Sequence, residues 1–312
     1  MKRMRETTPC ASSRRTAMPE ILYLVAPAEQ GPLDPRMLAE ARRLTGAEPR
    51  WLDPGSACAL PLARPADACL RANLDELLAG QPVDRALLPE ARGPRRLLVC
   101  DMDSTIVDIE CIDELAKHAG VGAEVATLTR RAMAGEIAFH EALETRVRML
   151  EGVPVRVIDE ICRERLRLHP GARTLVRTMQ AHGAFCALLS SGFTEFTRFV
   201  RTLVGFDMDQ ANTLEIRDGV LTGRLLPPRL GPESKLGTLK RLAARYGDGP
   251  RDAVAVGDGA NDIPMLEEAG LGVAYRGHPE VRRRADACIR HTDLRSVLFF
   301  QGLARDAFVE AG

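Results

Sequence analysis

Apolar residues recur along this chain in two patterns, short unbroken runs and positions spaced three or four residues apart. Short runs predict buried strands, and the spaced positions predict amphipathic helices. Strands are expected at 97–100, 184–189, 252–256 and 271–275, and helices at 172–182, 194–204, 234–246 and 262–269. Such alternation is typical of a parallel sheet with helices on both faces. The sequence therefore predicts an α/β domain over 93–312.

Four more helical segments interrupt the alternation directly after the first predicted strand. Gly or Pro bounds each of them, and they lie at 110–119, 122–134, 139–151 and 155–168. They predict a helical cap inserted at about 108–168. Later in the chain, an alternating segment has Asp218-Gly219 at its middle, which is a typical hairpin turn. A small β-hairpin is therefore expected at about 211–226.

The two ends of the chain have patterns of their own. Residues 20–92 predict strand, helix, strand and helix before a Pro/Gly/Arg-rich joint, so we expect a small α+β domain there. The C-terminal segment 291–309 predicts a closing helix that buries Phe299 and Phe300. Residues 1–19 are basic but lack the apolar stretch of a secretory signal. They predict a disordered basic tail, or a start assigned upstream of Met18.

Composition narrows the class of protein. Of 312 residues, 45% are hydrophobic and 28% charged, and 43 basic side chains balance 43 acidic ones. Nucleic-acid binding needs a basic excess, so no nucleic-acid partner is expected. No run of 18 or more apolar residues occurs, so no membrane span is expected either. The eight cysteines include no C-x-x-C pair, which favours reduced core thiols in a cytoplasmic protein over a zinc site or disulfide framework.

Acidic residues gather where two of the predicted strands end. Asp101 and Asp103 follow the first strand two residues apart, a spacing that lets both carboxylates project to the same side. Asp258 and Asp262 follow another strand, and ligands of α/β sheets bind at the carboxyl ends of strands. A single such aspartate could equally be a helix N-cap. Two clusters of hard oxygen ligands without His or Cys favour a Mg²⁺ site.

A hydroxyl-rich turn and one lysine extend this candidate site. Ser190, Ser191 and Gly192 follow a third strand, where small hydroxyls and backbone N–H groups can bind an anion, although the same residues are common in ordinary loops. Lys235, one of four lysines beside 39 arginines, lies at the start of a predicted helix. Taken alone, Lys235 is typical of a solvated helix residue. An aspartate that attacks a phosphate dianion, however, needs a nearby cation to offset repulsion.

Four segments in order, DMDST (101–105), SSGF (190–193), Lys235 and GDGAND (257–262), resemble the motifs of the haloacid dehalogenase superfamily of phosphohydrolases. The resemblance covers about 95–295, and the cap segments DMDSTIVDIECIDELAKHAG and RRAMAGEIAFHEALETRVRMLEG resemble the branch that acts on phosphoserine. It implies a Rossmann-like core with a helical cap and Mg²⁺-dependent hydrolysis of O-phospho-L-serine to L-serine and phosphate. The reaction would pass through an aspartyl-phosphate and serve L-serine biosynthesis.

The resemblance also implies roles for individual residues. Asp101 would be the nucleophile, and Asp103 would protonate the leaving oxygen and then activate water. Asp101, the backbone carbonyl of Asp103, and Asp258 would hold Mg²⁺, with Asp262 as a supporting carboxylate. The phosphate oxygens would be bound by Ser190, Ser191, Lys235 and Asn261.

The cap would select the substrate. The resemblance implies that Glu110 accepts the α-ammonium group of phosphoserine, that Arg146 clamps its carboxylate, and that Phe139 roofs the closed pocket. One position departs from the family, which usually has Ser-Gly-Gly-Phe where this chain has a second serine, Ser191. If Ser191 keeps a negative φ, its hydroxyl could add a donor.

Two alternatives to phosphoserine hydrolysis remain open from the sequence. A relative with the same cap could transfer the phosphoryl group to another alcohol, such as homoserine. A phospho-aspartate signalling receiver also combines aspartates, a hydroxyl and a lysine on an α/β sheet, although it lacks a cap after its first strand. The 20–92 domain resembles small amino-acid-binding (ACT-like) regulatory modules, and a dimerisation role in a homodimer or a packing role is equally open.

Overall fold

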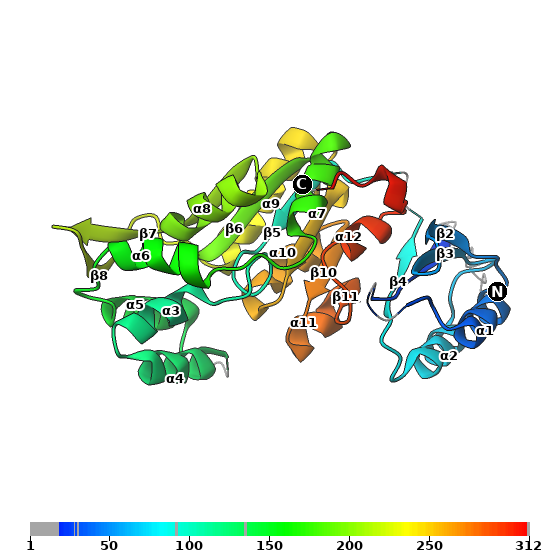
Figure 1. Ribbon diagram of the computed structural model, residues 1–312, viewed down its shortest axis with the longest axis horizontal. Coiled ribbons are helices and arrows are strands. Elements are labelled where there is room, and N and C mark those ends of the chain that lie inside the picture. The colour runs from blue at the N-terminus through cyan, green and yellow to red at the C-terminus, as the bar shows by residue number, and fades with distance from the viewer. Residues whose placement is uncertain (1–18, 28, 30, 91–92, 134–135, 311–312) are drawn as a thin grey trace, which may run out of the picture.

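The computed structural model describes residues 19–27, 29, 31–90, 93–133 and 136–310. The predicted tail at 1–19 lies outside the described residues, apart from Pro19. One eleven-stranded sheet extends through the molecule (Figure 1), in the order β2-β3-β1-β4-β11-β10-β9-β5-β6-β7-β8. The predicted α/β fold is confirmed, because a block of neighbouring strands runs parallel. In sheet order these are β11 (Ala287–Ile289), β10 (Leu271–Tyr275), β9 (Ala253–Gly257), β5 (Leu97–Cys100), β6 (Phe185–Phe193) and β7 (Met208–Arg217).

The central strands are apolar along their whole length because both faces of the sheet are covered. In β5, Leu98 and Cys100 pack into one core and Leu97 and Val99 into the other. The first core is closed by α7 (Ala172–Ala181) and α8 (Thr194–Val204), and the second by α9 (Pro232–Tyr246), α10 (Ile263–Glu268) and α11 (Pro279–Arg284). This double burial holds the carboxyl ends of β9, β5 and β6 side by side.

The inserted helices form the cap at one end of the molecule (Figure 1). They are α3 (Cys111–His118), α4 (Gly122–Met133), α5 (Phe139–Arg148) and α6 (Arg156–Glu160). The helix expected at 155–168 ends three residues early, because α6 continues as a π-helical turn at 161–165 and residues 166–168 are extended chain. That extended chain bridges Leu168 to Val107, so the two connections between cap and core run together.

The predicted hairpin consists of β7 and β8 (Val220–Leu226). Asp218 has φ 50° and Gly219 has φ 77°, the left-handed conformations that a tight hairpin turn requires. Leu221 of β8 exchanges backbone hydrogen bonds with the end of the cap, accepting from Gly152 N at 2.8 Å and donating to Val153 O at 2.9 Å. The hairpin therefore supports the helical cap directly.

The N-terminal unit extends the same sheet in antiparallel fashion. It contains β1 (Glu20–Val25), α1 (Pro35–Thr45), β2 (Arg50–Asp53), β3 (Ala57–Pro61), α2 (Ala68–Leu78) and β4 (Asp84–Pro89). Along β1, Leu22 and Leu24 pack with α1 and α2, whereas Tyr23 on the other face packs with the C-terminal segment. β4 pairs with β11 through Ala86 and Ala287.

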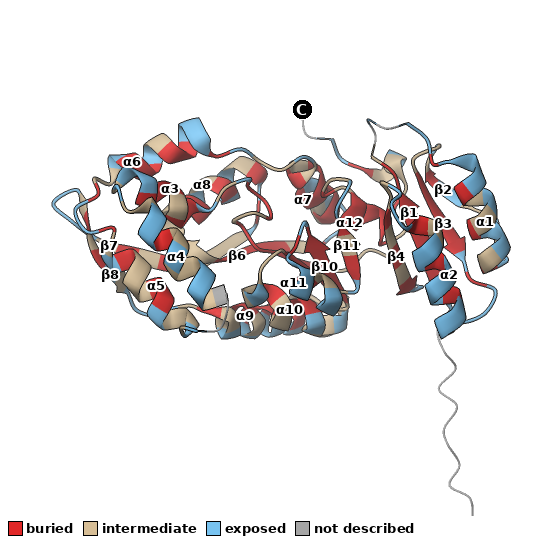
Figure 2. Ribbon diagram, turned by 90° about the horizontal axis from the view of Figure 1, so that it is seen from below, coloured by how far each residue is buried: buried red, intermediate tan, exposed pale blue. Residues whose placement is uncertain are grey.

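The closing helix expected at 291–309 is wrong. This segment holds only the single turn α12 (Ser296–Phe299) and a short 3₁₀ turn at 305–307. Gly302, at φ 79°, takes the left-handed conformation that ends a helix. Phe299 and Phe300 are buried as expected, and the Phe300 ring lies 6.3 Å from the ring of Tyr23. Figure 2 shows buried residues continuing across this junction from the core into the N-terminal unit.

Among the helices of the described residues, none has the length and apolar character needed to cross a bilayer.

Candidate active site

The predicted aspartates and serines of the site come from three neighbouring parallel strands and the segments that follow them. β5 lies between β9 and β6, so the chain segments that follow these strands emerge at one edge of the sheet. Asp101 follows β5, Asp258 follows β9, and Ser190 lies near the end of β6. The sheet topology thus brings together residues that are up to 157 positions apart in the sequence.

Lys235 lies at the centre of this edge. Its Nζ is 2.7 Å from Asp101 Oδ1 and 2.7 Å from Asp262 Oδ1, and only 3% of the lysine is exposed. The lysine is in the first turn of α9, where its backbone N–H donates to Gly231 O. Burial alone would lower the pKa of Lys235, but the two carboxylates outweigh burial and raise it. Lys235 is therefore a fixed cation beside the candidate nucleophile.

Asp262 uses both of its carboxylate oxygens within the protein. Oδ1 binds Lys235, and Oδ2 accepts from the backbone N–H groups of Asp258 at 3.2 Å and Gly259 at 3.0 Å. Gly257 makes room for this carboxylate, because a Cβ there would lie 2.5 Å from Asp262 Cγ. These contacts are those of a supporting carboxylate that orders the loop after β9.

The donor set fits a Mg²⁺ ion. Asp101, Asp258 and Asp262 each offer a carboxylate oxygen within 4.8 Å of the others. Asp258 Oδ1 accepts from the Thr105 hydroxyl at 2.7 Å, and Asp101 Oδ1 accepts from Lys235 and Met102 N. Among the described residues, no hydrogen bond engages the second oxygen of Asp101 or of Asp258. Hard oxygen ligands of this kind suit Mg²⁺.

The same carboxylates carry more negative charge than Lys235 offsets. Loss of solvation and the charge of Asp262 raise the pKa of Asp101 well above its usual range and that of Asp258 to about 7. A divalent cation at this position would stabilise both carboxylates in their ionised form.

Asp103 lies beside the nucleophile position but has a different environment. Its Oδ1 accepts from Cys111 N at 2.8 Å, and its Oδ2 accepts from the Ser190 hydroxyl at 3.1 Å. Burial raises the pKa of Asp103, although these hydrogen bonds partly oppose the change. A raised pKa increases the protonated fraction of a carboxyl group, which suits Asp103 to protonate a leaving oxygen.

The last residues of β6, 190–193, which we call the phosphate turn, present the hydroxyl groups expected for phosphate, and the pairing of β6 with β7 is irregular there. Ser190 Oγ also accepts from Gly192 N at 2.8 Å, and Ser191 Oγ accepts from Asn261 Nδ2 at 3.3 Å. Ser191 is not among the residues with positive φ, so its extra Cβ does not strain the turn. The structure thus places Ser191 against Asn261.

Glu110 and Arg146 lie on the cap side of the site. Glu110 begins α3 and accepts from the Ser104 hydroxyl at 2.6 Å. Loss of solvation and the charge of Asp103 raise the pKa of Glu110, although solvent still reaches its side chain.

Arg146, in α5, donates only to Thr129 Oγ1 at 3.3 Å and Ala142 O at 3.2 Å, and among the described residues no carboxylate pairs with it. Burial lowers the pKa of Arg146, while the charges of Asp113 and Glu110 oppose that change. Phe139 begins α5 and is half-buried, with the ring of His140 edge-on at 5.5 Å.

Sequence reasoning missed three polar residues in this region. Thr105 is fully buried against Asp258, and Ser104 takes a left-handed φ of 56° to reach Glu110. Both lie inside the DMDST motif, and their position beside two aspartates could have indicated a role in the site. The third, Asn212, lies inside a strand of the predicted hairpin, and no local pattern marks it.

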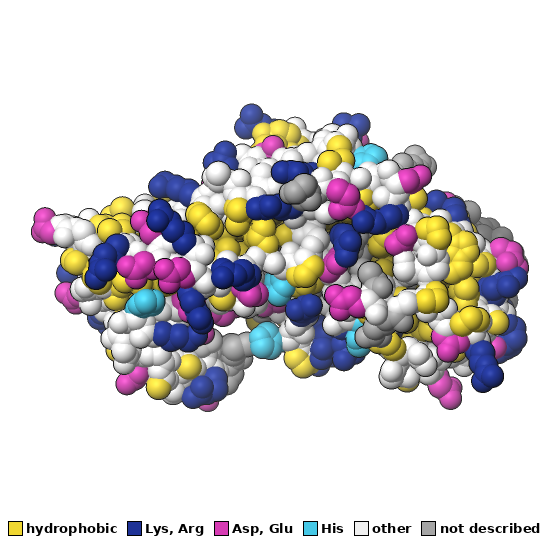
Figure 3. Space-filling view, in the orientation of Figure 1, with side chains coloured by type: hydrophobic (Ala, Val, Ile, Leu, Met, Phe, Trp, Pro, Cys, Tyr) yellow, Lys and Arg dark blue, Asp and Glu magenta, His cyan; other side chains and the backbone are white. Residues whose placement is uncertain are grey.

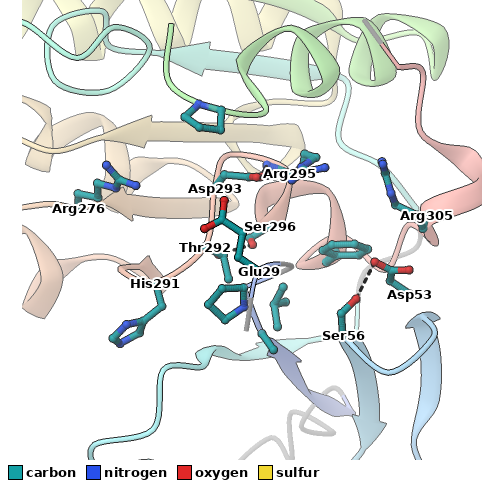
Figure 4. A pocket seen from close by; sticks show the side chains of 15 residues that line it. Glu29, Asp53, Ser56, Arg276, His291, Thr292, Asp293, Arg295, Ser296 and Arg305 are labelled. Carbon is teal, nitrogen blue, oxygen red and sulfur yellow. Dashed lines mark hydrogen bonds and ion pairs between the residues drawn. The ribbon is translucent and has the colours of Figure 1, made fainter. Parts of the chain in front are cut away.

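A cavity of about 310 Å³ lies elsewhere, between the N-terminal unit and the loop after β11 (Figure 4). Two polar contacts lie within its lining: Arg295 pairs with Asp293 at 2.5 Å, and Ser56 donates to Asp53 at 2.6 Å. None of the aspartates of the acidic cluster lines this cavity, so the strand ends remain the candidate active site.

Known proteins resemble the chain over this region. The model of the haloacid dehalogenase-like hydrolase family matches residues 98–267. A Polaromonas protein named phosphoserine phosphatase is 46% identical over 208 residues, which are 65% of this chain and 88% of that protein. A phosphoserine phosphatase of Archaeoglobus fulgidus is 46% identical over 64% of this chain, but the chain spans only 58% of its length.

Similarity in structure extends further along the chain. The crystal structure of a HAD family hydrolase from Salmonella enterica serovar Typhi has a TM-score of 0.78 and 30% sequence identity. The match covers 92% of this chain and 99% of that one, and therefore includes most of the N-terminal unit.

Proposed function

The chain belongs to the haloacid dehalogenase-like hydrolase family, and on that basis we propose that it is a phosphoserine phosphatase. It hydrolyses O-phospho-L-serine to L-serine and phosphate in two steps through an aspartyl-phosphate. The observation that carries the proposal is the position of Asp101, buried at a strand end, held by Lys235 on one oxygen and next to Asp103. The names of the similar proteins support phosphoserine as the substrate.

The first step follows from how Asp101 is held. Lys235 and Met102 N occupy Oδ1, which leaves Oδ2 to attack phosphorus. Asp103, oriented by Ser190 and Cys111, donates its proton to the serine oxygen as the P–O bond breaks. Asp101, Asp258 and the backbone carbonyl of Asp103 would hold Mg²⁺, whose charge would offset the repulsion between carboxylate and phosphate.

The second step reverses the role of Asp103. Having lost its proton, Asp103 accepts one from a water molecule, which attacks the phosphorus of the aspartyl-phosphate and releases Asp101. Ser190, Ser191, Lys235 and Asn261 hold the phosphate oxygens. The hydrogen bond between Asn261 and Ser191 supports a shared role for these two side chains.

Selection of phosphoserine depends on the cap. Arg146 binds the substrate carboxylate, Glu110 accepts the ammonium group, and Phe139 covers the pocket. The support is that Glu110 and Arg146 carry opposite charges and that neither forms an ion pair among the described residues. In addition, the charge of Glu110 opposes the lowering of the Arg146 pKa by burial.

We expect Arg146→Ala to raise KM for phosphoserine by about tenfold to a hundredfold with a smaller effect on kcat, because a charge-assisted clamp on the ground state is removed. Phosphoethanolamine, which lacks the carboxylate, should lose little. The matched control is Arg148→Ala, an exposed arginine two residues along the same helix. Steady-state kinetics on both substrates checks the prediction, and equal losses on the two substrates would rule out the clamp.

Magnesium should stabilise the fold in a pH-dependent way. The pKa of Asp258 is raised from 3.8 to about 7, so its ionised form destabilises the metal-free protein as pH rises through that interval. Mg²⁺ binds the ionised form, and its effect on Tm should therefore be larger at pH 8 than at pH 5.5. Calorimetry with Mg²⁺ or with chelator measures this directly. An equal shift at both pH values would contradict the metal assignment.

Phosphate release tests the proposed function and separates it from its alternatives. Phosphoserine should be hydrolysed in water with Mg²⁺ present and not with excess chelator. A phosphotransferase would release no phosphate in water alone and would form phosphohomoserine when homoserine is added. A receiver-type protein would take up phosphate on aspartate without turnover, and the cap after β5 argues against that reading.

Two further expectations belong to the proposal, a cytoplasmic location and a role for the N-terminal unit. The packing of Tyr23 against Phe300 supports a packing role for this unit. A homodimer stays a prediction, and the apolar side chains over β2 and β3 (Figure 3), with Trp51 at 42% exposed, are where a partner would bind. Sedimentation of the wild type and of Trp51→Ser tests it.

A further inference from the structure

Asn212 of β7 has no exposed surface, and its carboxamide joins the phosphate turn at the end of β6 to the loop that precedes α9. Nδ2 donates to Ser191 O at 2.9 Å and to Leu230 O at 3.2 Å, and Oδ1 accepts from Leu230 N at 2.7 Å. Two partners accept and one donates, so only one orientation of the amide satisfies all three. We propose that Asn212 is a positioning residue for phosphoryl transfer, an inference that rests on the proposed function.

The first of these segments is the phosphate turn at the end of β6. Asn212 holds the carbonyl of Ser191 from one side, while Gly192 N and Asp103 hold the Ser190 hydroxyl from the other. The backbone between these points therefore has little freedom to rotate. Its N–H groups and hydroxyls keep a fixed direction toward the phosphate.

The second segment is the loop that leads into the helix of Lys235. Leu230, held at both N–H and carbonyl by Asn212, is followed by Gly231, whose carbonyl accepts from Ser234 N at 3.0 Å and from Lys235 N at 3.4 Å. A displacement of Leu230 is therefore passed to the first turn of α9. Lys235 and its contact with Asp101 would move with that turn.

The same loop also meets the cap. Arg229 Nη1 lies 2.5 Å from Glu144 Oε1, and His140 Nε2 lies 3.2 Å from Glu233 Oε1, so α5 is held on both sides of Leu230. The buried carboxamide of Asn212 thus fixes the relative positions of three elements: the phosphate turn, the first turn of α9 with Lys235, and the contact between cap and core. Because two of these three elements act on the phosphoryl group itself, loss of Asn212 should affect every phosphomonoester.

The test uses full-length Asn212→Ala and the milder Asn212→Ser, assayed with phosphoserine and with p-nitrophenyl phosphate. We expect kcat to fall by about tenfold to a hundredfold, by a similar factor on both substrates, with KM nearly unchanged. Thr197→Val is the matched control, because Thr197 is equally buried and donates to Asp209 of the same strand at 2.7 Å, but touches neither segment. All assays are run well below the Tm of each variant.

The control decides the outcome. A fall in kcat for the Asn212 variants, with Thr197→Val unchanged despite a comparable loss of Tm, supports positioning. Three results would overturn the proposal. The first is an unchanged kcat in Asn212→Ser, and the second is a loss of kcat in Thr197→Val that matches its loss of Tm as it does in the Asn212 variants. The third is a loss of kcat on phosphoserine alone. If Asn212→Ala does not fold, Asn212→Ser provides the measurement. Wild type that hydrolyses p-nitrophenyl phosphate but not phosphoserine would refute the proposed substrate and still report on Asn212.

Discussion

Asp101→Asn is expected to lower kcat for phosphoserine by at least about a thousandfold, because an amide cannot form the acyl-phosphate on which both steps depend. The amide has nearly the shape of the carboxylate and can still accept from Lys235 and Met102 N. The fold should therefore survive, as near-ultraviolet circular dichroism would show. Asp252→Asn, at the opposite end of β9, is the control and should keep full activity.

A comparison with Asp103→Asn separates the two aspartates by role. With p-nitrophenyl phosphate, whose leaving group needs no proton, Asp103→Asn can still form the aspartyl-phosphate but lacks the base that activates water. Mass spectrometry of acid-quenched protein should therefore find phosphate on Asp101 in Asp103→Asn and none in Asp101→Asn. Phosphate attached to the Asp101→Asn protein would move the nucleophile to another residue.

Much of the fold was predictable because its signals are local. Every residue of β5 and β9 is apolar, which is typical of strands that are covered on both faces. The closing helix was not predictable in the same way. Its apolar spacing resembles a helix, but Phe299 and Phe300 are buried against the N-terminal unit, and Gly302 ends the helix.

The candidate site divides along a similar line. Asp101, Asp103 and Asp258 stand at the ends of obvious strands, so sequence alone could nominate them. Asn212 has no comparable signal, because its role depends on Ser191 and Leu230, which are brought to it only by the pairing of β6 with β7 and by the return of the chain from β8. Supporting residues of this kind are defined by tertiary contacts, which leave no periodic trace in the sequence.

The continuity of the sheet was also beyond reach of the sequence. The strand β4 carries Asp84, which is buried and accepts from the backbone N–H groups of Arg290 at 2.8 Å and Thr292 at 2.8 Å. These contacts join residues more than 200 positions apart. The Pro/Gly/Arg-rich joint at 89–96 suggested a domain boundary. However, β4, which precedes the joint, pairs with β11 near the end of the chain, so one sheet continues across the boundary.

Replacing Lys235 by methionine should have the largest combined effect on activity and stability. The side chain is apolar and of similar length, so it fills the space, but Asp101 and Asp262 are left buried without a cation. Breaking a buried pair in this way costs about 3–5 kcal/mol of the free energy of unfolding. We expect kcat to fall by at least about a hundredfold as well, because the cation beside the phosphate is lost. Chemical denaturation in excess chelator, where Mg²⁺ cannot compensate, measures the first effect.

The pH dependence and a second substitution identify the cause of that loss. In the wild type, the raised pKa of Lys235 means that its contribution is complete below about pH 10 and is lost only above that range. In the wild type the charge of Lys235 lowers the pKa of Asp101, so Lys235→Met should raise that pKa further above its unfolded value. The variant then regains more stability than the wild type as pH falls, and its deficit grows from pH 5 to pH 8. Adding Asp262→Asn removes one of the two unpaired charges and should restore part of the stability without restoring activity. A deficit that is independent of pH and unchanged by Asp262→Asn would show that Lys235 stabilises the fold by packing, and its place as the charge partner of Asp101 would have to be abandoned.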